Sequence, residues 1–179
     1  MQVKIVKNIE IKIAEEMLKL LKNNSFKFIT VELILKKLRL PKKKIPNNIR
    51  NKNDLLKNLN NYFDNQILAK ISSIEKSHSR DMMFEILMIR FDLLNRYRNS
   101  VIKIFNFLKK NPKNFISLIP GFVKSVDMMA RSSNINTKGI IGRIKLKGLI
   151  IIYFSSFITW VKDESSSLDK TMKVLDNYL

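Results

Sequence analysis

The sequence predicts an all-α protein, and three observations support this prediction. Apolar residues recur at the three- and four-residue spacing of an amphipathic helix from one end of the chain to the other. The 179 residues include only 4 glycines and 4 prolines, which are too few for the many turns of a β-protein. Hydrophobic residues make up 45% of the chain, which is enough to bury a core.

The helical pattern divides the chain into about nine helices in two blocks. The first block is expected to hold a helix through Ile9 and Leu21, a short helix over 31–38 capped by Thr30, an element over 41–49, and a helix capped by Asn53. The second block is expected to hold helices over 82–97, 100–110, 115–130, 137–162 and 168–179. This pattern predicts a small three-helix head, residues 1–52, and a larger helical domain, residues 53–179.

Composition restricts the partners and the compartment. The net charge of +19 indicates an anionic partner, either nucleic acid or a membrane surface. Lys, Ile and Asn share AT-rich codons, so codon bias is an equally good explanation for much of this charge. Cysteine is absent, which excludes disulfides and thiol chemistry. No secretory signal or transit peptide is seen at the N-terminus, and the apolar run over 149–160 is too short to span a bilayer, so we expect a cytoplasmic protein with a buried core helix there.

The first fifty residues resemble the DNA-binding head of the TetR family. The match lies along the segment that forms the recognition helix and the start of the next helix in that family, at Leu40, Ile45, Ile49, Lys52, Asp54, Leu55 and Leu56. The resemblance implies a helix-turn-helix whose second helix enters the major groove.

Pro46 departs from that pattern, because it takes the place of an aromatic residue in the middle of the recognition helix. An interior proline removes a helical hydrogen bond and costs about 3 kcal/mol. Specific DNA reading is therefore not expected unless residues 41–49 form a continuous exposed helix. The basic side chains of this segment remain candidates for phosphate contacts without sequence preference: Lys42, Lys43, Lys44, Arg50 and Lys52. The alternative is a solvated basic loop.

The C-terminal part resembles the ubiquinone-biosynthesis accessory proteins of the Coq-nine family. The residues that fall on the family pattern without a gap are Ile152, Tyr153, Trp160, Asp163, Ser165, Thr171, Leu175 and Asp176. The resemblance implies a TetR-like fold without repressor function, which binds isoprenoid lipids and presents quinone precursors to a membrane-associated hydroxylase. At the surface stretch that the family uses towards the hydroxylase, this chain has residues 139–146 and lacks the aromatic pair of the family.

Aromatic, leucine and methionine side chains of the second block are the candidate lipid-binding residues, since such side chains adapt to a flexible apolar ligand. They are Phe84, Leu87, Phe91, Phe105, Leu108, Phe122, Met128, Met129, Tyr153, Phe157 and Trp160. The alternative is that these residues form an ordinary helical core, which is the usual role of apolar residues at this spacing.

Catalysis is not expected. His78 is the one histidine, and no second histidine or cysteine stands at metal-ligand spacing. Glu15 and Glu16 lack the histidine partners of a di-iron bundle, and no glycine-rich loop is present to hold phosphate. We therefore predict a protein that is not an enzyme and needs no metal or cofactor.

Two functions stay open from the sequence. The first is a lipid-binding accessory protein of ubiquinone biosynthesis, which works at the inner face of the membrane and binds an isoprenoid lipid and a quinone-pathway hydroxylase. The second is a TetR-family transcriptional regulator with a ligand-binding C-terminal domain. TetR-fold proteins commonly dimerise through their last two long helices, so the resemblance implies a homodimer, which the apolar faces over 137–162 and 168–179 would permit.

Overall fold

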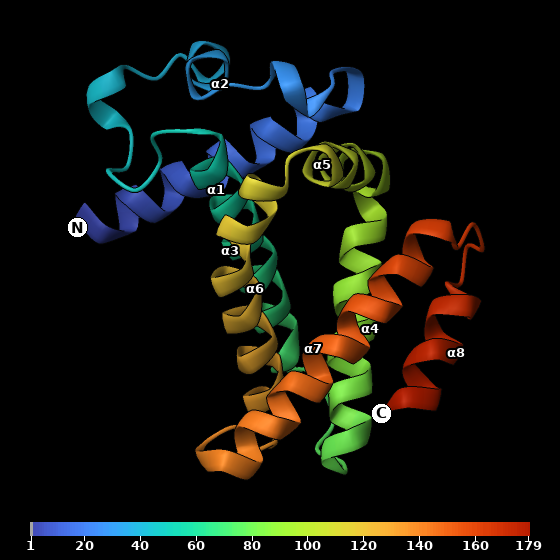
Figure 1. Cartoon of the computed structure of the whole chain (residues 1–179). Helices are drawn as coiled ribbons and strands as arrows, with labels where there is room; N and C mark the ends of the chain where they lie inside the picture. Colours follow the sequence, from blue (N-terminus) through green and yellow to red (C-terminus); the bar gives the residue numbers. More distant parts are fainter. Residues whose placement is uncertain (1) are drawn as a thin grey trace. The chain divides into compact units, whose positions relative to one another are not determined.

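The structure is a computed structural model, which describes residues 2–179 and the side chains from residue 6 onwards. Within this range the chain forms eight α-helices and two short 3-10 turns, and it forms no strand (Figure 1). The elements are α1 (Gln2–Asn23), η1 (Phe26–Phe28), α2 (Val31–Leu38), η2 (Lys42–Lys44), α3 (Lys52–Ile71), α4 (Ser79–Arg96), α5 (Arg98–Lys110), α6 (Pro112–Ser132), α7 (Gly139–Lys162) and α8 (Asp169–Tyr178). The predicted all-α class is confirmed.

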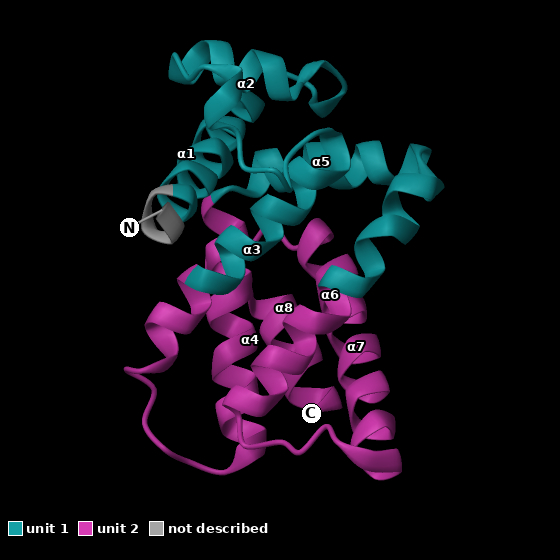
Figure 2. Ribbon diagram, turned by 90° about the vertical axis from the view of Figure 1, so that its left-hand side faces the viewer, with its two compact units in different colours: residues 1–65, 97–121 teal, residues 66–96, 122–179 magenta. Residues whose placement is uncertain are grey.

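The helices form two compact units, each built from segments that are distant in the sequence (Figure 2). Unit 1 contains the residues up to Asn65 and Tyr97–Gly121. Unit 2 contains Gln66–Arg96 and Phe122–Leu179. The division of the chain into functional segments after residue 52 stays a prediction.

Unit 1 is held together by the packing of α1 against α2 and α5. Met17 and Leu21 of α1 are fully buried, as is Phe26 of η1. The ring of Phe26 packs edge-on against Phe107 of α5, with centroids 4.9 Å apart. Such an arrangement is favourable because the positive edge of one aromatic ring meets the negative face of the other.

Two helices of unit 1, α2 and α3, begin at a capping side chain. Thr30 caps α2, since its hydroxyl accepts a hydrogen bond from the Leu33 amide at 3.1 Å, as predicted. The predicted cap of α3 is wrong by two residues: Asn51, and not Asn53, accepts from the Asp54 amide, at 3.1 Å. Asn53 lies inside the helix instead, and its side-chain oxygen Oδ1 accepts a hydrogen bond from the side-chain amide of Asn114 at 2.7 Å.

Unit 2 is built around α7, which packs against α4 and α8. Its buried residues follow one helical stripe, and they are Gly142, Leu149, Tyr153, Ser156 and Trp160. The opposite face is not buried, since Ile151 is 66% exposed. The prediction of a buried core helix over 149–160 is therefore correct for one face of α7 and wrong for the other.

A network of polar side chains fixes the connection between α6 and α7. The Thr137 hydroxyl donates a 2.5 Å hydrogen bond to Asp127, whose other oxygen lies 2.7 Å from the Arg131 guanidinium. The backbone of Thr137 lies so close to Gly142 that a Cβ there would be 2.3 Å from the Thr137 carbonyl carbon. Only glycine fits this position without a shift of the backbone.

Candidate functional site

The segment between α2 and α3 decides whether the head has a helix that can read DNA. In the described chain this segment contains the 3-10 turn η2 and no α-helix over 41–49. Ile45 leaves the turn in an extended conformation, with φ −69° and ψ 133°, because the residue before a proline is disfavoured in the α region. Pro46 also lacks the N–H that a helical hydrogen bond requires. The prediction that Pro46 disrupts the reading helix is confirmed.

The end of this segment is anchored to α1 within unit 1 and is not a frayed helix. Pro46 and Ile49 are both buried, and the Ile49 amide donates to the Pro46 carbonyl at 2.9 Å. The side chain of Asn48 donates to the Glu10 carboxylate of α1 at 2.8 Å. These contacts stabilise a turn where a TetR-type head would continue its helix.

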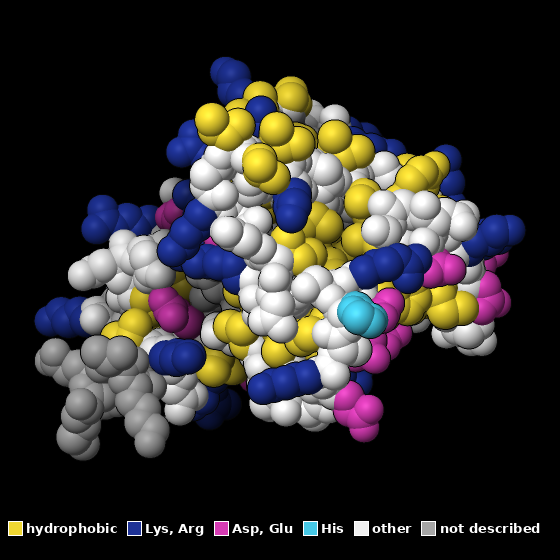
Figure 3. All heavy atoms as spheres, turned by 90° about the horizontal axis from the view of Figure 1, so that it is seen from below, with side chains coloured by type: hydrophobic (Ala, Val, Ile, Leu, Met, Phe, Trp, Pro, Cys, Tyr) yellow, Lys and Arg dark blue, Asp and Glu magenta, His cyan; other side chains and the backbone are white. Residues whose placement is uncertain are grey.

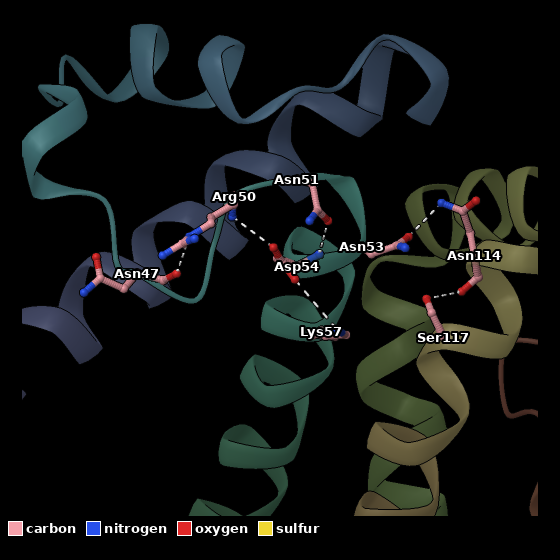
Figure 4. A network of polar contacts seen from close by, with 8 residues as sticks. All are labelled: Asn47, Arg50, Asn51, Asn53, Asp54, Lys57, Asn114 and Ser117. Carbon is pink, nitrogen blue, oxygen red and sulfur yellow. Dashed lines mark hydrogen bonds and ion pairs between the residues drawn. The ribbon is translucent and has the colours of Figure 1, made fainter.

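Arg50 is exposed and positioned by a local network at the start of α3 (Figure 4). Its Nε donates to the Asn47 carbonyl at 3.0 Å, and its backbone amide donates to the Asp54 carboxylate at 3.0 Å. Lys57 lies 3.7 Å from the same carboxylate. The guanidinium is thus close to the backbone of its own turn, while its charge remains at the surface.

Lys52 has a different role from the other predicted phosphate-binding residues. Its ammonium group donates to the carbonyl oxygens of Phe26, at 3.5 Å, and of Lys27. It also lies 5.7 Å from the centre of the Phe26 ring. Lys52 therefore joins the start of α3 to η1, and its charge is used within the fold of unit 1.

The remaining basic residues form one exposed segment of the surface. Residues 36–50 carry seven positive side chains and no acidic one, and all seven are exposed: Lys36, Lys37, Arg39, Lys42, Lys43, Lys44 and Arg50. Exposed lysines attract phosphate groups but cannot distinguish base sequences from the backbone side. The arrangement can support non-specific binding to an anionic partner.

The eleven candidate lipid-binding residues divide between the two units. Unit 2 contains Phe84, Leu87, Phe91, Phe122, Met128, Met129, Tyr153, Phe157 and Trp160. Phe105 and Leu108 belong to α5 of unit 1 and are half-buried there. In unit 2, Leu87, Phe91, Met129 and Trp160 are fully buried, and Tyr153 is nearly so. Phe84, Phe122, Met128 and Phe157 are half-buried.

Aromatic rings follow one another through unit 2. Tyr153 stacks on Phe91 with centroids 5.5 Å apart, and Phe122 lies 4.9 Å from the same tyrosine ring. At the other end Phe157 lies 5.4 Å from Trp160. Phe154, which the sequence analysis missed, lies between the two pairs, 6.2 Å from Phe122 and 6.5 Å from Phe157. These side chains form a continuous series of aromatic contacts within one unit, which is partly buried and partly half-buried.

Arg90 is a further residue that the sequence analysis missed. It is only 3% exposed, although it carries a full charge. Its Nε donates to the Tyr153 hydroxyl at 2.8 Å, and its guanidinium lies 5.4 Å from the centre of the same ring. The signal was present in the sequence, because Arg90 follows Ile86 by four residues and Leu87 by three, on the inward face of α4.

Residues 6–179 contain no group of three or more acidic or histidine side chains placed to hold a metal ion. His78 lies exposed in the loop before α4.

Comparison with solved structures identifies a similar protein. The crystal structure of a TetR transcriptional regulator from Nitrosomonas europaea ATCC 19718 superimposes with a TM-score of 0.75, covers 95% of each chain and is 17% identical in sequence. No protein-family model matches the sequence, and no curated protein matches it. The likeness shows that the fold is TetR-like, as predicted, and at this identity it carries the fold alone.

Proposed function

We propose that this TetR-like protein is a lipid-binding accessory protein of ubiquinone biosynthesis that presents isoprenoid quinone precursors to a membrane-associated hydroxylase. The observation that carries the proposal is that the fold is kept while the segment 41–49 is not a helix. A regulator needs the first turns of that helix to contact base edges. A ligand carrier does not need them.

The C-terminal motif supports the choice of ligand. Tyr153, Trp160, Asp163 and Thr171 match the pattern of the accessory proteins, and all four are buried. Tyr153 and Trp160 belong to the series of aromatic rings in unit 2, which suits a long apolar ligand with unsaturated bonds. The fold is also one in which we expect binding and no catalysis.

Lipid extraction tests this proposal directly. Mass spectrometry of organic extracts from the purified protein is expected to show an isoprenoid lipid or a ubiquinone precursor, and adding that lipid to stripped protein is expected to raise the melting temperature. The variant F122S/F157S changes two half-buried rings of unit 2 and should lose the lipid. F28S, at an exposed ring of unit 1, is the control and should keep it. A clean extract without a thermal shift would reject the proposal.

The second candidate is a transcriptional regulator with a ligand-binding domain. It is favoured by the name of the structural neighbour and by the seven exposed basic residues over 36–50. Selection from a random DNA pool should then yield a sequence motif. Binding without sequence preference, which weakens steeply as salt rises, would reject this candidate because phosphate contacts alone behave in that way.

A homodimer remains part of the proposal. The second half of α7 presents Ile151 and Phe154 to the surface, and α8 presents Met172. Apolar faces of this kind permit a second copy to pack against them. Analytical ultracentrifugation at micromolar concentration tests this point, and a single monomer species would count against it.

A further inference from the structure

Helix α7 has two apolar faces, and only one of them is used by the fold. The stripe through Leu149, Tyr153 and Trp160 is buried in unit 2. The opposite stripe, at the same helical spacing, passes through Ile140, Ile144 and Ile151 and is exposed. Alone among the described helices, α7 is long and apolar enough to cross a membrane, a criterion of length and composition alone.

The first turns of α7 carry the most exposed part of this stripe. Ile140, Ile141 and Ile144 are 82%, 72% and 64% exposed. They alternate with the exposed basic residues Arg143, Lys145 and Lys147, and these six residues are here called the α7 patch. Figure 3 looks onto the end of unit 2 where α7 begins and shows hydrophobic side chains interspersed with Lys and Arg side chains.

The charged side chains of α7 all have one sign, and the nearest acidic residue, Asp127 of α6, is paired with Arg131. Residues 128–162 contain six basic side chains and no acidic one. The first turn of α7 has no acidic residue, although the positive end of the helix dipole would favour one there. No ion pair or helix-dipole effect among the described residues of unit 2 therefore accounts for Arg143, Lys145 and Lys147, and no packing accounts for three isoleucines that face solvent.

We propose that the α7 patch docks on an anionic membrane surface. Its isoleucines would enter the boundary between headgroups and acyl chains, and its basic residues would pair with lipid phosphates, as the two faces of interfacial helices do. The charge of the α7 patch favours an anionic membrane over a second copy of the chain, because two copies would bring like-charged basic patches together. Isoleucine decides against nucleic acid, since it has no π-face on which a base can stack.

The inference deepens the proposed function, and it rests on that function for the choice of a membrane over an acidic protein. A carrier of isoprenoid lipids must reach the bilayer in which its ligand resides. Lipid carriage and membrane docking can still be tested separately, because binding to vesicles is measured on protein stripped of lipid. A clean extract without a thermal shift would reject the carrier and leave vesicle binding to be scored by itself.

Vesicle co-sedimentation tests the α7 patch. The full chain is mixed with phosphatidylcholine vesicles that contain phosphatidylglycerol, and with vesicles of phosphatidylcholine alone. Binding is expected only to the first and is expected to weaken with salt. Each basic residue near an anionic surface contributes about fivefold in affinity, so removing three of them costs roughly a hundredfold, and the new negative charges of R143E/K145E/K147E should weaken binding further. I140S/I141S/I144S should also lose binding while its net charge is unchanged.

The matched control is K42E/K43E/K44E, which changes the net charge by the same amount at exposed residues of η2. It should retain most of the binding, and circular dichroism should show all variants folded. Equal loss in both charge variants would overturn the proposal, because binding would then follow net charge and not the α7 patch. So would the absence of binding to anionic vesicles, or conversion of a dimer to a monomer by I140S/I141S/I144S in ultracentrifugation.

Discussion

The carboxylate of Asp163 accepts two hydrogen bonds from Thr171, one from its backbone amide and one from its hydroxyl, each at 2.8 Å. The other carboxylate oxygen accepts from the Ser165 hydroxyl at 2.6 Å. Asp163 is 1% exposed, and burial is the largest single influence on its pKa, which it raises. The hydrogen bonds from Ser165 and Thr171 together outweigh burial and lower the pKa to about 2.

The low pKa of Asp163 predicts a pH-dependent contribution to stability. Between the unfolded pKa of 3.8 and the folded value of about 2, the unfolded state binds more protons, so stability falls as the pH falls through this window. The shift corresponds to about 2 kcal/mol at pH 7, of which about half is lost by pH 3. D163N should lower the free energy of unfolding at pH 7, and the gap to wild type should narrow towards pH 3 in urea denaturation.

The quantity to follow is the difference in unfolding free energy between wild type and D163N, because the other carboxylates titrate equally in both proteins. D176N removes an exposed carboxylate of α8 and serves as a control with a small, shallow effect. If the difference in unfolding free energy between wild type and D163N stays constant from pH 7 to pH 3, the pKa of Asp163 is not lowered by folding.

The position of Gly142, near the start of α7, has no room for a side chain larger than hydrogen. G142A places a methyl group 2.3 Å from the Thr137 carbonyl carbon, and backbone atoms cannot yield as a flexible side chain can. We expect a loss of about 1–3 kcal/mol, the usual cost of overpacking. G148A is the matched control in the same helix, since nothing lies within 4 Å of its added Cβ.

In the control, alanine should stabilise the helix by about 0.5–1 kcal/mol, because glycine is the weaker helix former. We therefore expect thermal unfolding to show a lower melting temperature for G142A and a higher one for G148A. Shifts of the same sign would mean that the contact between Thr137 and Gly142 does not constrain the connection.

Substitution of Lys52 should lower the free energy of unfolding, whereas substitution of an ordinary surface lysine should not. K52A removes the ammonium bound to the carbonyls of Phe26 and Lys27 and the contact with the Phe26 ring. We expect a cost of about 1–2 kcal/mol, since hydrogen bonds to charged groups contribute more than neutral ones. K44A, at an exposed lysine of η2, should change the free energy of unfolding by less than about 0.5 kcal/mol.

Chemical denaturation of K52A and K44A separates a structural role from a binding role. If K44A lowers stability as much as K52A, the contacts of Lys52 do not matter for the fold. If K52A leaves stability unchanged and weakens phosphate binding, then the original prediction for Lys52 was right.

Much of the fold was readable from the sequence because its signals are local. The spacing of apolar residues predicted the helices, Thr30 predicted the start of α2, and Pro46 predicted the lost reading helix. Asn53 was misassigned since two asparagines lie two residues apart, and only the geometry of the turn decides which one caps the helix. Competing caps within one turn are not resolved by pattern.

The candidate site was less readable, because its contacts join distant segments. Lys52 looked like its basic neighbours, and only the position of the Phe26 and Lys27 carbonyls shows its role. The exposure of Ile140 likewise depends on which face of α7 meets α4 and α8, and a helix with apolar residues on both faces does not reveal this. Periodicity identifies a buried face only when the opposite face is polar.

The pairing of Arg90 with Tyr153 predicts that a single hydroxyl contributes to the stability of unit 2. Y153F keeps the stacking on Phe91 and removes the oxygen that accepts from the Arg90 Nε at 2.8 Å. A buried charged donor then loses one acceptor, which costs about 1–3 kcal/mol. Urea denaturation should show this loss for Y153F and almost none for Y178F, whose ring is 64% exposed.

The variant R90M tests the same pair from the other side. Methionine of similar length fills the space of the guanidinium stem, and the Tyr153 hydroxyl then loses its donor. In a double-mutant cycle, Y153F should cost less in the R90M background than in wild type, because the two side chains act as a unit. Additive losses would mean that the hydrogen bond between them contributes nothing, and that Arg90 is held by its other contacts.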